Sequence, residues 1–121
     1  MSIMHVNSFA AGEWVAPGLG ARPIESAITG AIIAEAGNDA LDVQAMLDHA
    51  RTVGGPALRA MTFHDRARML KALAQYLNER KQPLYDISFD TGATQKDHLI
   101  DIDGGIGTLF VYASKGRREL P

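Results

Sequence analysis

The sequence predicts an α+β fold, in which one or two β-hairpins are followed by about four helices. Two observations lead to this prediction. Residues 1–37 consist of short apolar runs divided by turn residues, which is typical of strands and hairpins. From Asn38 onward, apolar residues recur with the period of about 3.6 that marks an amphipathic helix. We therefore expect a strand region over residues 1–37 and a helical region over residues 38–121.

The composition is that of one ordinary globular domain. The chain has 121 residues, of which 46% are hydrophobic and 21% charged, and a formal net charge of -2. Because such a chain has little electrostatic attraction for phosphates, we do not expect nucleic acid as a partner. No window approaches the roughly 18 apolar residues of a membrane helix, and the first residues do not form a secretion signal. We therefore expect no membrane partner and a cytoplasmic location.

The strand region contains the turn residues of two hairpins. Gly12 lies within residues 9–15, a run with an aromatic residue near each end. A second apolar run, over residues 21–36, is interrupted at Gly30. A glycine between two such segments is typical of a hairpin turn, so we expect one or two exposed hairpins.

The first helix is expected to begin near Asp39, whose carboxylate can accept hydrogen bonds from the free amides of a first turn. Its apolar stripe consists of Val43, Met46, Leu47, Ala50 and Val53. Gly54, Gly55 and Pro56 follow this stripe, and we expect them to end the helix.

The second helix is expected to begin at Thr62, with Asp65 as the carboxylate partner of a capping box. This helix carries two apolar rows, and the second row consists of Met69, Leu73 and Tyr76. A helix with two apolar rows packs on two sides, so we expect it to need more than one partner.

Two further helices are expected. Pro83 suits the first turn of a helix over residues 84–90, and Gly92 can adopt the positive φ that ends it. The last helix is expected over residues 96–115, with Gly116 at its end.

Gly104, Gly105 and Gly107 lie inside this last helix, although a glycine in a helix interior costs about 1 kcal/mol relative to alanine. The missing side chains serve either close packing of the helix or room beside a ligand. A phosphate-binding loop is excluded, because no strand precedes the glycines and no Lys-Ser/Thr pair follows them.

No catalytic constellation is present in the sequence. The chain has no cysteine, which excludes disulfides, thiolate metal sites and a cysteine nucleophile. The serines lack the sequence context of an activated nucleophile. The four histidines share no common spacing and are expected at the surface or at helix ends: His5, His49, His64 and His98.

Asp97 and Asp101 lie one helical turn apart and invite a metal-site interpretation, but Asp103 points to another side of the helix. The pattern of a calcium-binding loop also fails, because Gly105 and Tyr112 stand where it needs ligands. We therefore predict no metal site, and expect these carboxylates to complement the helix dipole and to bond neighbouring helices.

The order of several short motifs resembles the N-terminal region of the aldehyde dehydrogenase superfamily. These motifs are residues 9–15, the Ala-Ile-Thr-Gly turn at 27–30, and residues 40–53, 66–73, 90–92 and 101–113. Residues 55–63 and 103–110 look closer still to one branch. That branch is the phenylacetate-degradation enzyme, which oxidises a ring-opened CoA-thioester semialdehyde; the benzoyl-CoA pathway semialdehyde dehydrogenase is the near alternative.

The resemblance implies an oxidation that depends on NAD or NADP and passes through a cysteine thiohemiacetal, with a glutamate assisting the attack of water. In the family these residues follow the region matched here. The resemblance therefore implies an N-terminal piece of an α/β enzyme that is inactive by itself, with no catalytic or cofactor-binding residue in this chain. Residues 1–37 are expected near the contact region of a homo-oligomer, and residues 38–121 in the NAD(P)-binding domain.

The resemblance also implies one functional surface. In the family, the helix with the Asp-x-Asp motif borders the substrate tunnel, and a larger side chain commonly follows the second Asp. Gly104 occupies that position here. We therefore expect Ile100, Gly104 and Gly105 to line a tunnel widened for a bulky aldehyde substrate, with a CoA-linked aldehyde as one such substrate. The alternative is close helix packing through Gly104 and Gly107.

A function of a different class stays open, namely a self-contained helical interaction module with a hairpin arm. The second apolar row of the helix that begins at Thr62 favours the enzyme fragment. A four-helix unit by itself would leave one of the two rows exposed to solvent.

Overall fold

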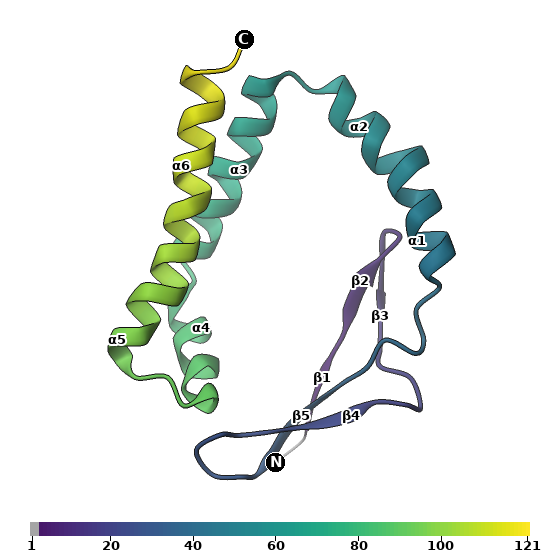
Figure 1. Ribbon diagram of the computed structural model, residues 1–121, viewed down its shortest axis with the longest axis vertical. Coiled ribbons are helices and arrows are strands. Elements are labelled where there is room, and N and C mark those ends of the chain that lie inside the picture. Colours follow the sequence, from purple (N-terminus) through teal and green to yellow (C-terminus); the bar gives the residue numbers. More distant parts are fainter. Residues whose placement is uncertain (1–2) are drawn as a thin grey trace. The chain divides into compact units, whose positions relative to one another are not determined.

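A computed structural model describes residues 3–121, which contain both strands and helices (Figure 1). The chain forms two compact units, Met1–Pro56 and Ala57–Pro121. All strands belong to the first unit, and the longest helices belong to the second. The mixed α and β class predicted from the sequence is confirmed.

The strands form two small sheets. The strands are β1 (Met4–Val6), β2 (Ser8–Ala10), β3 (Glu13–Val15), β4 (Arg22–Glu25) and β5 (Ile32–Ala36). One sheet has the order β1-β5-β4, with β1 parallel and β4 antiparallel to β5, and the other is the antiparallel pair β2-β3.

The β2-β3 hairpin confirms the prediction made from Gly12. Ala11 and Gly12 both have positive φ, at 51° and 88°, as a tight two-residue turn requires. Phe9 and Trp14 face each other across the strands, and their ring centroids lie 5.1 Å apart at an interplanar angle of 62°. Both rings are mostly exposed, so the hairpin presents an aromatic surface.

The second predicted hairpin, β4-β5, is confirmed as well, and Gly30 lies in its turn with φ 70°. The Ser26 hydroxyl accepts hydrogen bonds from the amides of Ile28 and Thr29 at 3.2 and 3.4 Å. The parallel pairing of β1 with β5 was not predicted. All residues of β1 are exposed, so the strand has no alternation of buried and exposed positions that would predict which strand it pairs with.

The first helical segment is longer than predicted. It comprises α1 (Val43–His49), a π-turn (Ala50–Gly54) and α2 (Gly55–Ala60). The prediction that residues 54–56 end the helix was therefore wrong. A proline normally clashes with the carbonyl one turn before it. Here the wider π-turn, in which the Gly55 amide bonds to the Ala50 carbonyl, moves the preceding turn and lets the helix continue.

The cap of α1 also differs from the prediction. Asp42, not Asp39, precedes the helix, and its carboxylate accepts from the Ala45 amide at 2.9 Å. Asp39 instead accepts from the Gly20 amide at 2.8 Å. An aspartate carboxylate can accept a hydrogen bond from any free amide close to it. The loop at Gly20 brings such an amide to Asp39.

The next two helices agree with the prediction. α3 (Phe63–Asn78) begins with a complete capping box, in which Thr62 Oγ1 accepts from the Asp65 amide at 3.0 Å. α4 (Lys81–Ser88) continues into a 3-10 turn, Phe89–Thr91, and Gly92 ends it in the left-handed conformation with φ 85°.

The last helix is continuous over α5 (Gln95–His98), a π-turn (Leu99–Asp103) and α6 (Gly104–Arg118). The predicted helix over residues 96–115 is thus confirmed, but Gly116 does not end it. Gly116 lies where α6 runs antiparallel beside α3 (Figure 1), and a Cβ added there would lie 3.1 Å from Ala67 Cβ. The glycine therefore permits close approach of the two helices.

Small side chains dominate the core of the described residues. The buried hydrophobic residues are Ala34, Ala67, Ala74, Ile106 and Ala113. The second apolar row of α3 is exposed instead, with Met69 at 47%, Leu73 at 46% and Tyr76 at 55%. Exposed apolar rows of this size are typical of a surface that another part of a protein covers. Among residues 3–121, none of the helices combines the length and the apolar character needed to cross a membrane.

Candidate functional site

The three residues predicted to line a tunnel lie where the π-turn meets α6. Ile100, in the turn, is 66% exposed. A Cβ added at Gly104 or Gly105 would find no atom of the described residues within 4 Å, apart from its chain neighbours and the nearby backbone of its own helix. The three positions are therefore exposed at the start of α6, and space is open beside the two glycines.

The alternative role of these glycines, close helix packing through Gly104 and Gly107, has no partner among the described residues. Neither Gly104 nor Gly107 approaches another helix, since an added Cβ at either position meets nothing within 4 Å. Gly116 has that role instead, against Ala67 of α3. From the sequence alone, a glycine that allows close approach of a second helix could not be distinguished from a glycine that leaves open space beside the helix.

Asp103, the last residue of the π-turn, is bound by two side chains of α4. Lys81 Nζ pairs with Asp103 Oδ1, and the Tyr85 hydroxyl donates to Asp103 Oδ2 at 2.5 Å. Both carboxylate oxygens are thus engaged, and the Lys81 and Asp103 side chains are only 30% and 26% exposed. The predicted bonding of an acidic residue to a neighbouring helix is confirmed here.

These contacts shift the protonation of all three groups. The hydrogen bonds from Lys81 and then Tyr85 hold the pKa of Asp103 below its ordinary value of 3.8. The same carboxylate raises the pKa of Lys81 above 10.5 and that of Tyr85 above 10.0. The stabilisation from Asp103 is therefore complete above pH 3.8 and lost as the pH falls through its lowered pKa. The stabilisation from Lys81 and Tyr85 is complete below their ordinary values and lost as the pH rises through the raised ones.

His98, which immediately precedes the π-turn, is buried, with an exposed fraction of 1%. It lies at the end of α5, as one of the two expected positions allowed, but the expectation of a surface or capping histidine was wrong, because the side chain is buried and makes no capping hydrogen bond. The imidazole stacks on Tyr85 at 5.4 Å between ring centroids and lies perpendicular to the Phe89 ring, with the centroids 4.4 Å apart. Neither ring nitrogen has a hydrogen-bond partner among residues 3–121. Two aromatic rings contributed by the α4 segment bury this histidine, and sequence spacing did not indicate them.

The other acidic residues of the last helix have local roles. The Asp97 carboxylate accepts from the amide and the hydroxyl of Thr94, at 2.7 and 2.8 Å, and completes a capping box for α5. These bonds hold the pKa of Asp97 below its ordinary value. Asp101 is exposed. In the part of the chain that the structure describes, no three His, Cys, Asp or Glu side chains lie close enough to hold a metal ion.

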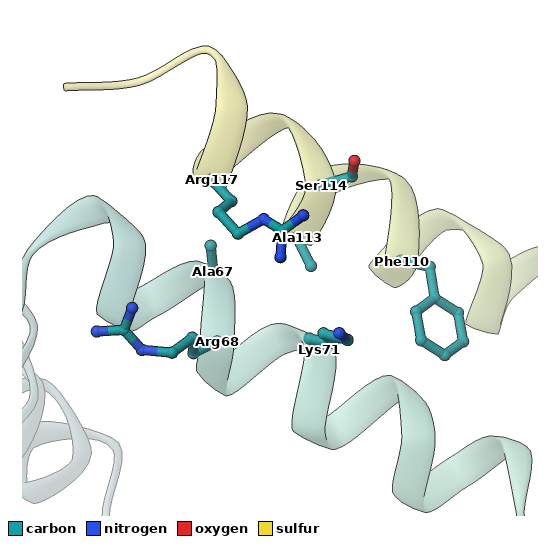
Figure 2. A pocket seen from close by; sticks show the side chains of 7 residues that line it. All are labelled: Ala67, Arg68, Lys71, Phe110, Ala113, Ser114 and Arg117. Atoms are coloured by element: carbon teal, nitrogen blue, oxygen red, sulfur yellow. The ribbon is translucent and has the colours of Figure 1, made fainter.

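A second feature is a basic groove of about 440 Å³ between α3 and α6 (Figure 2). Its lining residues are Ala67, Arg68 and Lys71 from α3 and Phe110, Ala113, Ser114 and Arg117 from α6. Arg68 pairs with Asp65. Among residues 3–121, no acidic side chain forms an ion pair with Lys71 or Arg117, so the groove carries positive charge that can attract an anion.

Comparison with known proteins identifies the family. The aldehyde dehydrogenase family matches residues 14–120 of this chain. The chain belongs to the aldehyde dehydrogenase family. Residues 9–15 and the helical motifs after them had indicated this resemblance, and it is confirmed.

One relative is a 3,4-dehydroadipyl-CoA semialdehyde dehydrogenase from Aromatoleum evansii, 34% identical over 115 residues. The match covers 94% of this chain but 22% of the relative. The predicted likeness to the CoA-semialdehyde branch of the family is thereby confirmed. This aldehyde dehydrogenase chain spans about a fifth of the length of the relative.

Proposed function

We propose that this chain forms the N-terminal part of an NAD(P)-dependent aldehyde dehydrogenase that oxidises a CoA-thioester semialdehyde to the corresponding acid. The observation that carries the proposal is the 34% identity to a CoA-semialdehyde dehydrogenase over most of the chain. The match covers only 22% of that relative, which supports the proposal that the rest of a longer polypeptide is the partner of this chain. The small alanine core and the exposed second row of α3 argue against a self-contained interaction module.

We expect no complete site for NAD or NADP among the described residues. Gly104, Gly105 and Gly107 lie inside a continuous helix, whose backbone amides are largely used in helical hydrogen bonds and are not free for a phosphate. The cofactor would accept the hydride that leaves the aldehyde carbon. We therefore place both the cofactor and the nucleophile in the remaining part of the enzyme, and expect this chain alone to be inactive.

The contribution of this chain is a wall of the substrate tunnel. A wall with an exposed Ile100 and no side chain at Gly104 or Gly105 combines an apolar contact with open space. Such a surface suits a long acyl chain better than a short aldehyde, because a long chain fills the space and buries apolar area.

The basic groove supports an anionic substrate. Lys71 and Arg117 offer positive charge beside the hydroxyl-bearing Ser114. Phosphate groups such as those of CoA are bound in proteins by lysine and arginine side chains. The groove is therefore consistent with a substrate that carries a CoA group, whereas an unlinked aldehyde has no charge to place there.

The proposal is tested by kinetics of the full-length enzyme. We expect kcat/KM for a CoA-thioester semialdehyde, followed by NADPH or NADH absorbance, to exceed that for the same semialdehyde without CoA by at least about tenfold. Purified residues 1–121 serve as the negative control and should show no turnover. Equal kcat/KM values for the two substrates would contradict the CoA-linked assignment, and turnover by the isolated chain would contradict the placement of the nucleophile.

We also propose that residues 1–37 lie near a subunit interface of a homo-oligomer. Phe9 and Trp14 are 61% and 71% exposed on a short hairpin, and such aromatic surface is typical of an interface. Deleting residues 1–37 from the full-length enzyme should lower the oligomeric mass, measured by light scattering, more than it changes the Kd for the cofactor. An unchanged oligomeric mass would refute this assignment.

A further inference from the structure

The π-turn Leu99–Asp103 determines which residues of the last helix lie on its buried face. A π-turn inserts one extra residue into a helix. If the inserted residue is not counted, His98 is separated from Ile106 by the same number of residues as Ile106 is from Ala113. This separation is about two helical turns. His98, Ile106 and Ala113 therefore share one face, and all three are buried.

The same insertion sets the direction of the open surface. If the turn were an ordinary α-helical turn, the residues before it would rotate by about 100° relative to α6. Ile100 would then no longer lie in its present direction relative to Gly104. The shape of this surface thus depends on whether the π-turn is kept, and π-turns are rare in helices because their hydrogen-bond pattern is less favourable.

Contacts with α4 and with the 3-10 turn that follows it lie at both ends of the π-turn. Before the turn, His98 packs between Tyr85 and Phe89, with ring centroids at 5.4 and 4.4 Å. At its last residue, the Asp103 carboxylate is bound by Lys81 and by the Tyr85 hydroxyl. Tyr85 takes part at both ends, through its ring and through its hydroxyl. A shift of register would break the two contacts together.

We propose that Lys81, Tyr85 and Asp103 form a positioning brace that keeps the π-turn and thereby sets the substrate specificity of the surface at Ile100 and Gly104. The brace touches no reacting atom. Its effect on specificity rests on the proposed function of that surface as a tunnel wall, whereas its effect on the π-turn does not.

The test uses the full-length enzyme with Lys81→Met and Tyr85→Phe. Both variants remove a hydrogen bond to Asp103, but Tyr85→Phe keeps the aromatic ring that packs on His98. We expect kcat/KM for the CoA-linked semialdehyde to fall about tenfold in each, while kcat/KM for a short aliphatic aldehyde changes less than about twofold. Lys115→Met is the matched control, because Lys115 is exposed on α6 and its one ion pair within residues 3–121 is with Glu119, and it should change neither value.

Hydrogen exchange gives the second measurement. Amides of residues 99–103 should exchange faster in both variants than in the wild type, and those of α3 should not change. Unchanged exchange at residues 99–103 would overturn the brace. Faster exchange there with equal losses for both aldehydes would overturn its role in specificity. Failure of the wild-type enzyme to prefer the CoA-linked substrate would instead refute the proposed function, and the exchange result would still decide whether the brace exists.

Discussion

Gly104→Met in the full-length enzyme is expected to lower kcat/KM for the CoA-linked semialdehyde by on the order of a hundredfold. The methionine side chain would enter the space that is open beside Gly104 at the start of α6. A short aliphatic aldehyde does not need this width, so its kcat/KM should change only slightly. Steady-state kinetics with both substrates measure the difference.

Stability separates this interpretation from a structural one. Methionine at Gly104 should improve local helix propensity by about 1 kcal/mol, and the thermal midpoint of the variant should therefore not fall. Lys115→Met, which introduces the same side chain elsewhere on α6, should leave both substrates unaffected. Equal losses on both substrates together with a lower thermal midpoint would show that Gly104 serves packing against another part of the enzyme.

Gly116→Leu should destabilise the enzyme by about 1–3 kcal/mol, because the new side chain is forced against α3. Even a Cβ at this position would lie 3.1 Å from Ala67 Cβ, closer than ordinary van der Waals contact. The leucine must therefore push α6 away from α3 or distort both helices. Urea unfolding of the full-length enzyme, followed by circular dichroism, measures the change.

Gly107→Ala is the matched control on the same helix. Apart from its chain neighbours and the nearby backbone of α6, its Cβ meets no atom of the described residues within 4 Å, so the gain in helix propensity, about 1 kcal/mol, should not be opposed by a clash. A loss of stability in Gly107→Ala that equals the loss in Gly116→Leu would contradict the assignment of Gly116 as the position of close approach.

Features that depend on neighbouring residues could be predicted from the sequence. The capping box of Thr62 and Asp65, the turn at Gly12 and the helix end at Gly92 are all confirmed. Each involves groups only a few residues apart, so the residue types and their spacing contain the physical cause. The order of such motifs along the chain was also sufficient to indicate the family.

Part of the candidate site could be predicted in the same way. The open surface at Gly104 follows from glycines that are visible in the sequence, and the resemblance to the family gave them a role. Lys81 and Tyr85 were missed, although their spacing of one helical turn places them on one face of α4. Their spacing indicated that Lys81 and Tyr85 could bind one common partner, but the sequence does not say which acidic side chain contacts that face of α4.

The sequence by itself determined the division into a strand region and a helical region, the capping box of α3 and the family of this chain, because these follow from local chemistry and from the order of motifs. Only the tertiary structure decided that the helix continues past Pro56, that His98 is buried and that Asp103 is bound by α4. It also decided that Gly116, and not Gly107, admits the neighbouring helix. The physical reason is the same in each case. A π-turn, a buried imidazole and a helix contact are stabilised by groups that folding brings together. The spacing of residues along the chain does not give the distances between those groups.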